Sequence, residues 1–71
     1  MKAKDLMGRK VYDKDAIEVG KISDFEINTS TFAIEKIYIK SGLTTHNKTE
    51  PDKIDRIGDT IILLIPKGEL K

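Results

Sequence analysis

A single histidine and a few aspartates are the residues through which this chain could carry out acid–base or metal chemistry. His46 lies in the polar stretch "TTHNK" and is the only histidine. A general base needs a partner that orients it, and a metal site needs several ligands that converge. No Asp or Glu has a spacing to His46 that suggests either arrangement. We therefore expect His46 to be an exposed loop residue without a catalytic role.

The aspartates could in principle gather a divalent cation. The EF-hand pattern D-x-D-x-D-G is absent, and "DKIDRIGD" spaces its aspartates by three and four residues rather than by two. Turn-forming and strand-flanking roles account for most of them. The aspartates considered are Asp13, Asp15, Asp52, Asp55 and Asp59. We predict no metal, no cofactor and no catalytic residue.

The glycines and the absence of cysteine exclude two further kinds of site. Gly8, Gly20 and Gly58 occur singly, not as G-x-G-x-x-G or a P-loop, so we expect them to mark turns and bends. With no cysteine, the chain has no thiolate nucleophile, disulfide or sulfur-ligated metal. The sequence indicates no nucleotide site.

Lys36, Tyr38 and Lys40 alternate along an expected strand and would share one face, where they could form a stacking platform for nucleic acid. Glu35 is adjacent, only 6% of the residues are aromatic, and 13 basic residues are balanced by 12 acidic ones. Balanced charge provides no field that would attract a polyanion. A solvated strand face is the favoured interpretation, and nucleic-acid binding is possible without being favoured.

The apolar run "IILLI", residues 61–65, could supply an interface. In a small barrel either the odd or the even positions fill the interior, and the other set faces outward. If Ile62 and Leu64 face outward, their burial in a partner would contribute on the order of 1.5–3 kcal/mol per side chain before association costs. Alternatively, the N-terminal "AKDLM" or the tail with Leu70 covers them. We expect a homodimer, because the core of so short a chain is small.

The elements that must position these residues are short strands. Turn signals recur at short intervals, and no segment has a convincing helical period, which favours a small barrel or sandwich. We predict strands at residues 9–13 and 18–28, a third in "TFAIEKIYIKSG", a short or edge strand around residues 48–50, and a last strand in "TIILLI". After Pro51 we expect one helical turn or an irregular strand, and Gly58-Asp59 should form a two-residue type II′ hairpin turn.

The two long strands change face partway along. In residues 18–28, Val19 and Phe25 have one parity and Ile22 has the other. Phe32 and Ile34 likewise differ in parity from Ile37 and Ile39, with the change near Glu35 and Lys36. Corners of this kind are made by glycines and bulges. We predict a bend at Gly20 and a bulge near Ser23 and Asp24, where Asp24 could accept backbone N–H groups.

Three stretches carry a family resemblance, namely "LMGRKVYDKDAIEVGKISDFEI", "TFAIEKIYIK" and "DKIDRIGDTIIL". Their order, from about Leu6 to Leu64, resembles the PRC-barrel family, known from the H subunit of photosynthetic reaction centres and from a bacterial ribosome-maturation factor. The resemblance implies an all-β fold, a small, strongly bent antiparallel β-barrel of five to six strands. The chain departs from the family pattern at residues 13–16, where a glycine is usual in the first turn.

The resemblance also implies a function. It favours a non-catalytic adaptor or assembly module that acts through protein–protein contacts. For the stand-alone archaeal type that this chain resembles, the resemblance further implies a role in archaeal cell division. The alternative is an RNA-associated factor in ribosome or RNA maturation, which predicts that Lys36, Lys40, Lys48 and Lys53 converge on one face. Residues 1–71 are expected to form a single cytoplasmic domain that does not insert into a membrane, because they show neither a signal-peptide pattern nor a run of about 20 apolar residues.

Overall fold

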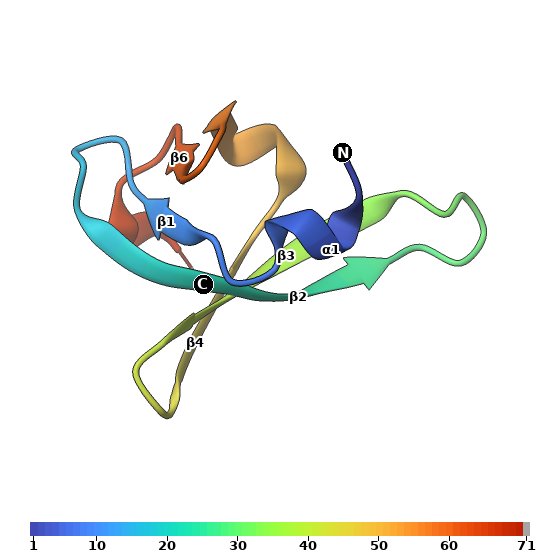
Figure 1. The fold of residues 1–71 in the computed structure, drawn as a ribbon, viewed down its shortest axis with the longest axis horizontal. Coiled ribbons are helices and arrows are strands. Elements are labelled where there is room, and N and C mark those ends of the chain that lie inside the picture. The colour runs from blue at the N-terminus through green and yellow to red at the C-terminus, as the bar shows by residue number, and fades with distance from the viewer. Residues whose placement is uncertain (71) are drawn as a thin grey trace.

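A computed structural model describes residues 1–70, which form a six-stranded sheet flanked by short helical segments (Figure 1). The strand order is β4-β3-β2-β1-β6-β5. The elements are α1 (Ala3–Leu6), β1 (Lys10–Tyr12), β2 (Glu18–Ile27), β3 (Ile34–Ser41), β4 (Thr45–Thr49), the 3₁₀ turn η1 (Pro51–Lys53), β5 (Ile54–Ile57), β6 (Ile61–Leu63) and the 3₁₀ turn η2 (Lys67–Glu69).

The predicted all-β, strongly bent fold is confirmed, with two differences in detail. The hydrogen-bonded sheet has β4 and β5 at its edges, so it is barrel-like and bent rather than closed into a full ring. The pairing is also not antiparallel throughout, since β1 pairs with β6 in parallel. Local patterns do not reveal this pair, because it joins segments about fifty residues apart, Val11 opposite Ile61.

Bulges make the strands change face, as the parity slips predict. Between β2 and β3, Ile22 lies opposite Ile39 and Asp24 opposite Tyr38, so Ser23 is the extra residue. A second slip in the same pair makes Glu35 the extra residue of β3. Each bulge lets the apolar side chains return to the inner face after the sheet bends.

Gly20 lies where β2 bends closest to β3. Its φ is +154°, a conformation that side chains disfavour, and an added Cβ would overlap the Lys40 carbonyl oxygen. The same Cβ would stand 2.9 Å from the Lys40 carbonyl carbon and 3.1 Å from Ile39 Cγ2. Only glycine allows the two backbones to approach this closely.

The core occupies the concave side of the bent sheet. The odd positions of the last strand, Ile61 and Leu63, are buried, which decides the question that the sequence left open. Leu6 and Leu70 are partly buried and pack against the core from the two ends of the chain. The buried apolar residues are Val11, Val19, Ile22, Ile37, Ile39, Ile61 and Leu63.

Several predicted boundaries are wrong. The first strand is limited to Lys10–Tyr12, and the last ends at Leu63, so Leu64 lies beyond it. The third strand begins at Ile34 and leaves Phe32 in a loop. The edge position of β4 agrees with prediction, although this strand spans Thr45–Thr49 and contains His46.

The predicted type II′ turn at Gly58-Asp59 is also wrong. Ile57 pairs with Ile61, so the loop has three residues, 58–60, and the positive-φ glycines are Gly8, Gly20 and Gly42 instead. The Gly58 carbonyl accepts a hydrogen bond from the Arg9 guanidinium, whose Nε also donates to the Asp5 carbonyl at 2.8 Å. A contact with a residue 49 positions away thus helps to fix this loop, which local turn chemistry could not indicate.

Candidate interaction surfaces

His46 lies on the edge strand β4 and not in a loop. It pairs with Lys40 of β3 and lines an open surface depression with Ser23, Asp24 and Tyr38. Within residues 1–70, no three His, Cys, Asp or Glu side chains gather closely enough to hold a metal ion.

Asp13 holds two distant segments together. Its side chain is buried, with Oδ1 accepting hydrogen bonds from Asp15 N at 2.8 Å and Ile17 N at 2.9 Å. Oδ2 accepts one from Lys67 N at 2.8 Å, at the start of η2. Burial raises the pKa of the Asp13 carboxyl, but the three backbone donors and the positive charge of Lys67 outweigh it, so that pKa lies below its ordinary value.

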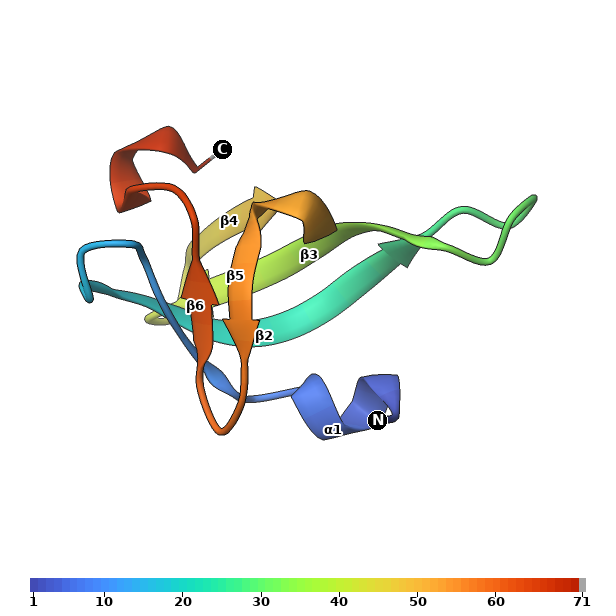
Figure 2. The same cartoon turned by 90° about the horizontal axis from the view of Figure 1, so that it is seen from above.

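The β2–β3 hairpin projects beyond the rest of the molecule at its far end, as both views show (Figures 1 and 2). Phe25 and Ile34 still pack against the core, whereas Ile27 is 51% exposed. Phe32, in the connecting loop, is 82% exposed. We call Ile27 and Phe32, with the loop of residues 28–33, the hairpin tip.

The hairpin tip is held in one conformation by its own hydrogen bonds. Asn28 Oδ1 accepts from Ser30 N at 2.8 Å and from Thr31 N at 3.3 Å. The Phe32 N–H donates to the Asn28 carbonyl at 2.6 Å, and Phe32 has φ +60°. This left-handed conformation is unfavourable for a bulky side chain, so the loop presents an aromatic ring to solvent in a strained backbone.

The two residues of the predicted interface, Ile62 and Leu64, differ in exposure. Ile62 is half-buried on the outer face of β6, opposite Arg56 of β5 and Tyr12 of β1. Leu64 is 51% exposed beyond the end of the strand, and its N–H donates to the Lys53 carbonyl at 2.7 Å. A dimer contact through these two side chains stays a prediction.

Gly8 and Asp24, two of the turn and bend residues predicted from the sequence, both lie beside the bent part of β2. Gly8, with φ +82°, follows α1 and donates its N–H to the Ile22 carbonyl at 2.8 Å. Asp24, directly after the Ser23 bulge, accepts a hydrogen bond from the Phe25 N–H at 2.7 Å. Gly8 thus contacts β2 two residues after Gly20, and Asp24 flanks the bulge at Ser23.

The outer face of β2, β3 and β4 carries the lysines considered for RNA. Lys36, Lys40 and Lys48 all point outward, by their register, whereas Lys53 lies in η1. Lys36 forms an ion pair with Glu50 at 3.8 Å, and Tyr38 donates its hydroxyl hydrogen to Glu26 at 2.9 Å. The hydrogen bond to Glu26 raises the pKa of Tyr38. Carboxylates therefore contact two residues of the face considered for nucleic-acid stacking, in agreement with the favoured interpretation of a solvated strand face.

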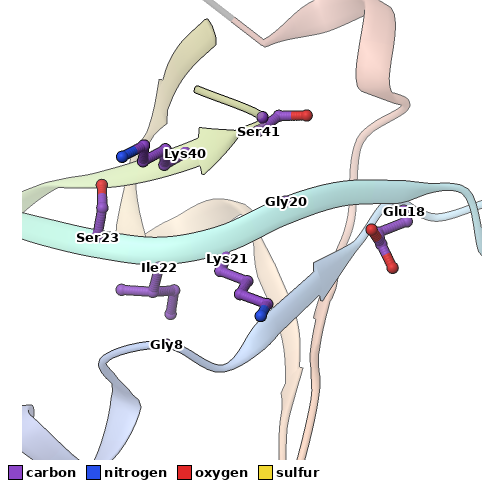
Figure 3. Close-up of a pocket in the computed structure, with 9 residues that line it drawn as sticks. Gly8, Glu18, Gly20, Lys21, Ile22, Ser23, Lys40 and Ser41 are labelled. Atoms are coloured by element: carbon purple, nitrogen blue, oxygen red, sulfur yellow. The ribbon is translucent and has the colours of Figure 1, made fainter. Parts of the chain in front are cut away.

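An open pocket of about 410 Å³ lies beside the bend of β2 (Figure 3). Lys21 and Lys40 lie on its walls together with Glu18, and Gly8, Gly20 and Gly42 contribute bare backbone. In Figure 3 the Lys21 side chain extends toward β1, whereas Lys40 lies over β3. The sequence drew attention to Lys40 alone, because the neighbourhood of Lys21 depends on strand register.

Sequence reasoning missed Phe32 as a surface residue and Asp13 as a buried anchor. The sequence places Phe32 in the predicted third strand, and the polar stretch "NTST" before it is the signal of a loop that exposes it. Asp13 was recognised as a turn residue, but its contact with Lys67 spans 54 positions. Neither environment can be read from local spacing.

The bent, six-stranded, all-β sheet defines a small β-barrel-like module. The family model of the PRC-barrel domain matches residues 1–70, and the chain belongs to this family. PRC-barrel domains are generally non-catalytic and often occur in protein-interaction contexts. A comparison with curated proteins finds no match. No helix within residues 1–70 has the length and hydropathy needed to cross a bilayer.

Proposed function

We propose that this PRC-barrel protein is a non-catalytic adaptor that docks on partner proteins through its hairpin tip. The observation that carries the proposal is Phe32, an aromatic side chain 82% exposed in a left-handed backbone conformation. Large aromatic residues that a partner can bury are the residues that most often dominate protein–protein binding energy. The tip projects from the body of the molecule, so a partner can reach it without rearranging the core.

The stability of the fold gives no reason for a phenylalanine at this position. Exposed on the surface, Phe32 gains little of the roughly 1.5–3 kcal/mol that burying such a side chain contributes. Its backbone conformation costs on the order of 1–3 kcal/mol, which glycine would avoid. An exposed and strained aromatic residue is therefore better explained by a partner that covers it than by folding.

An RNA-associated role has less support. Lys36 is paired with Glu50, and the Tyr38 hydroxyl is bound to Glu26, so carboxylates contact the face considered for nucleic-acid stacking. A role in archaeal cell division and a cytoplasmic location stay predictions from the family resemblance and the sequence.

Site-specific photo-crosslinking in cells tests the proposal. A photoreactive phenylalanine analogue at Phe32 should form discrete protein adducts that mass spectrometry identifies. The same analogue at Leu43, which is 91% exposed in the β3–β4 turn, is the matched control. Adducts to protein from position 32 and not from position 43 would support docking through the tip. Equal labelling from both positions, or adducts to RNA alone, would contradict it.

A further inference from the structure

Four basic side chains form one row across the outer face of the sheet. The register places Lys10 of β1 opposite Lys21 of β2, Lys21 opposite Lys40 of β3, and Lys40 opposite His46 of β4. All four residues are exposed. We call these four residues the basic row.

The three lysines of the basic row are unfavourable for the isolated sheet, because like charges directly opposite on neighbouring strands destabilise it. The adjacent rows avoid this cost, since Asp24 and Glu26 stand in line with Tyr38 and Lys36. Within residues 1–70, the basic row has one ion pair, between Lys10 and Glu18 at 4.0 Å. Lys21 and Lys40 form no ion pair with any described carboxylate. A negatively charged ligand would relieve this repulsion.

The open pocket beside Lys21 and Lys40 gives such a ligand a place to sit (Figure 3). Gly42 is exposed and leaves the backbone accessible there, and Ser41 adds a hydroxyl group. The Lys21 and Lys40 side chains extend in different directions from this pocket, so each could bind a separate carboxylate of one acidic segment (Figure 3).

The dimensions of the basic row favour a short acidic peptide over a nucleic acid. Three strand spacings of about 4.8 Å give the row a length of roughly 14 Å, and the row is one residue wide. Glu18 borders it on one side and Asp24 on the other. Nucleic-acid binders commonly neutralise about 6–10 phosphates, which exceeds what this strip offers. Flanking carboxylates would repel a continuous polyphosphate but leave room for a few separate acidic side chains.

We infer that the basic row binds an extended acidic segment of a partner protein, with its carboxylates on Lys21 and Lys40. The inference rests on the proposed function, because it presupposes a protein partner and specifies that the segment bound by the basic row is acidic. The hairpin tip supplies an apolar anchor, and the basic row supplies the electrostatic recognition of the same class of ligand. Electrostatic complementarity of this kind mainly selects partners and speeds association.

A titration followed by NMR tests the inference directly. The probe is a peptide of alternating Glu and Ser residues, added up to millimolar concentration to the isotopically labelled chain, with a Lys–Ser peptide as the charge control. We expect saturable amide shifts at Lys21, Lys40 and His46 with the acidic peptide alone. The double variant Lys21→Gln with Lys40→Gln removes two exposed ion pairs between lysine and peptide carboxylate. It should therefore lower the affinity for the acidic peptide about tenfold.

The matched control removes the same charge elsewhere. Lys4→Gln with Lys14→Gln changes two exposed lysines outside the row and should alter the affinity less than twofold. No saturable shift with the acidic peptide, or equal loss in both double variants, would overturn the inference. A single-stranded oligouridylate that binds more tightly than the peptide would overturn it as well. Crosslinking at Phe32 is independent of these lysines, so its outcome separates failure of the acidic site from failure of the docking function.

Discussion

Gly20 and Phe32 both have positive φ, at opposite ends of the same hairpin, and the sequence treats them differently. At Gly20 the two backbones nearly touch, and the chain has the one residue that fits. At Phe32 the side chain is exposed, and the chain has a residue that the conformation disfavours. At the near end of the hairpin, Gly20 is the residue that folding requires. At the far end, Phe32 adds backbone strain that folding does not require.

The largest expected effect comes from breaking the near end. Gly20→Ala should reduce the free energy of unfolding by about 3 kcal/mol or more, because the added methyl group overlaps the Lys40 carbonyl and β2 must move. Urea denaturation measures the change. In the control variant Gly68→Ala the added Cβ has no atom within 4 Å. Its free energy of unfolding should stay within about 0.5 kcal/mol of the wild-type value. Equal effects at both positions would mean that close backbone approach does not constrain the bend.

The next largest effect concerns Asp13, whose buried carboxylate stabilises the fold, as Gly20 does. Because the folded-state pKa of Asp13 lies below the unfolded one, its stabilisation is full above the unfolded pKa near 3.8 and is lost as pH falls through the lower folded value. Thermal unfolding should therefore show a falling melting temperature in this acidic window. Asp13→Asn should lower the melting temperature at neutral pH and flatten the acidic part of the profile. A profile unchanged by Asp13→Asn would assign acid sensitivity to other carboxylates.

Replacing Phe32 sharpens the comparison at the far end. Phe32→Gly should raise the free energy of unfolding by about 1 kcal/mol, because the strain at φ +60° is relieved, and should weaken the capture of the partner found by crosslinking. Ala16→Gly is the matched control, since Ala16 has φ +63° but carries no apolar anchor. It should stabilise by a similar amount without affecting the partner. A destabilised Phe32→Gly would show that the ring serves the fold after all.

The smallest expected effect on stability is at the predicted dimer contact. At a protein concentration low enough to dissociate the dimer, Leu64→Lys should change the free energy of unfolding by no more than about 0.5 kcal/mol, because the side chain is half-exposed beyond the end of β6. Light scattering of the intact protein should give a dimer mass, and that of Leu64→Lys a monomer mass. Ile62→Lys with Leu64→Lys extends the test, with circular dichroism to check folding. A monomeric wild type would remove self-association from the functional model.

The parts of this fold that could be predicted are those encoded by local alternation. The parity slips around Ser23 and Glu35 located both bulges of the β2–β3 pair, and an isolated glycine located the bend. The parallel β1–β6 pair, the Arg9–Gly58 contact and the Asp13–Lys67 contact were not predictable, because each joins residues far apart in sequence. The same reason hid the basic row, whose members become neighbours only when the register is known.

The parallel pairing of β1 with β6 has a consequence for the order of folding. Closing the loop between Val11 and Ile61 costs about 1 kcal/mol more chain entropy than closing the one between Ile22 and Ile39, since closure cost grows with the logarithm of loop length. The β2–β3 hairpin can therefore nucleate early, and the β1–β6 contact completes the sheet last. Such non-local completion is typical of β-rich domains that fold in milliseconds to seconds. The last step also brings Asp13 to Lys67, so the segments nearest the two ends of the described chain should lock together in a single late event.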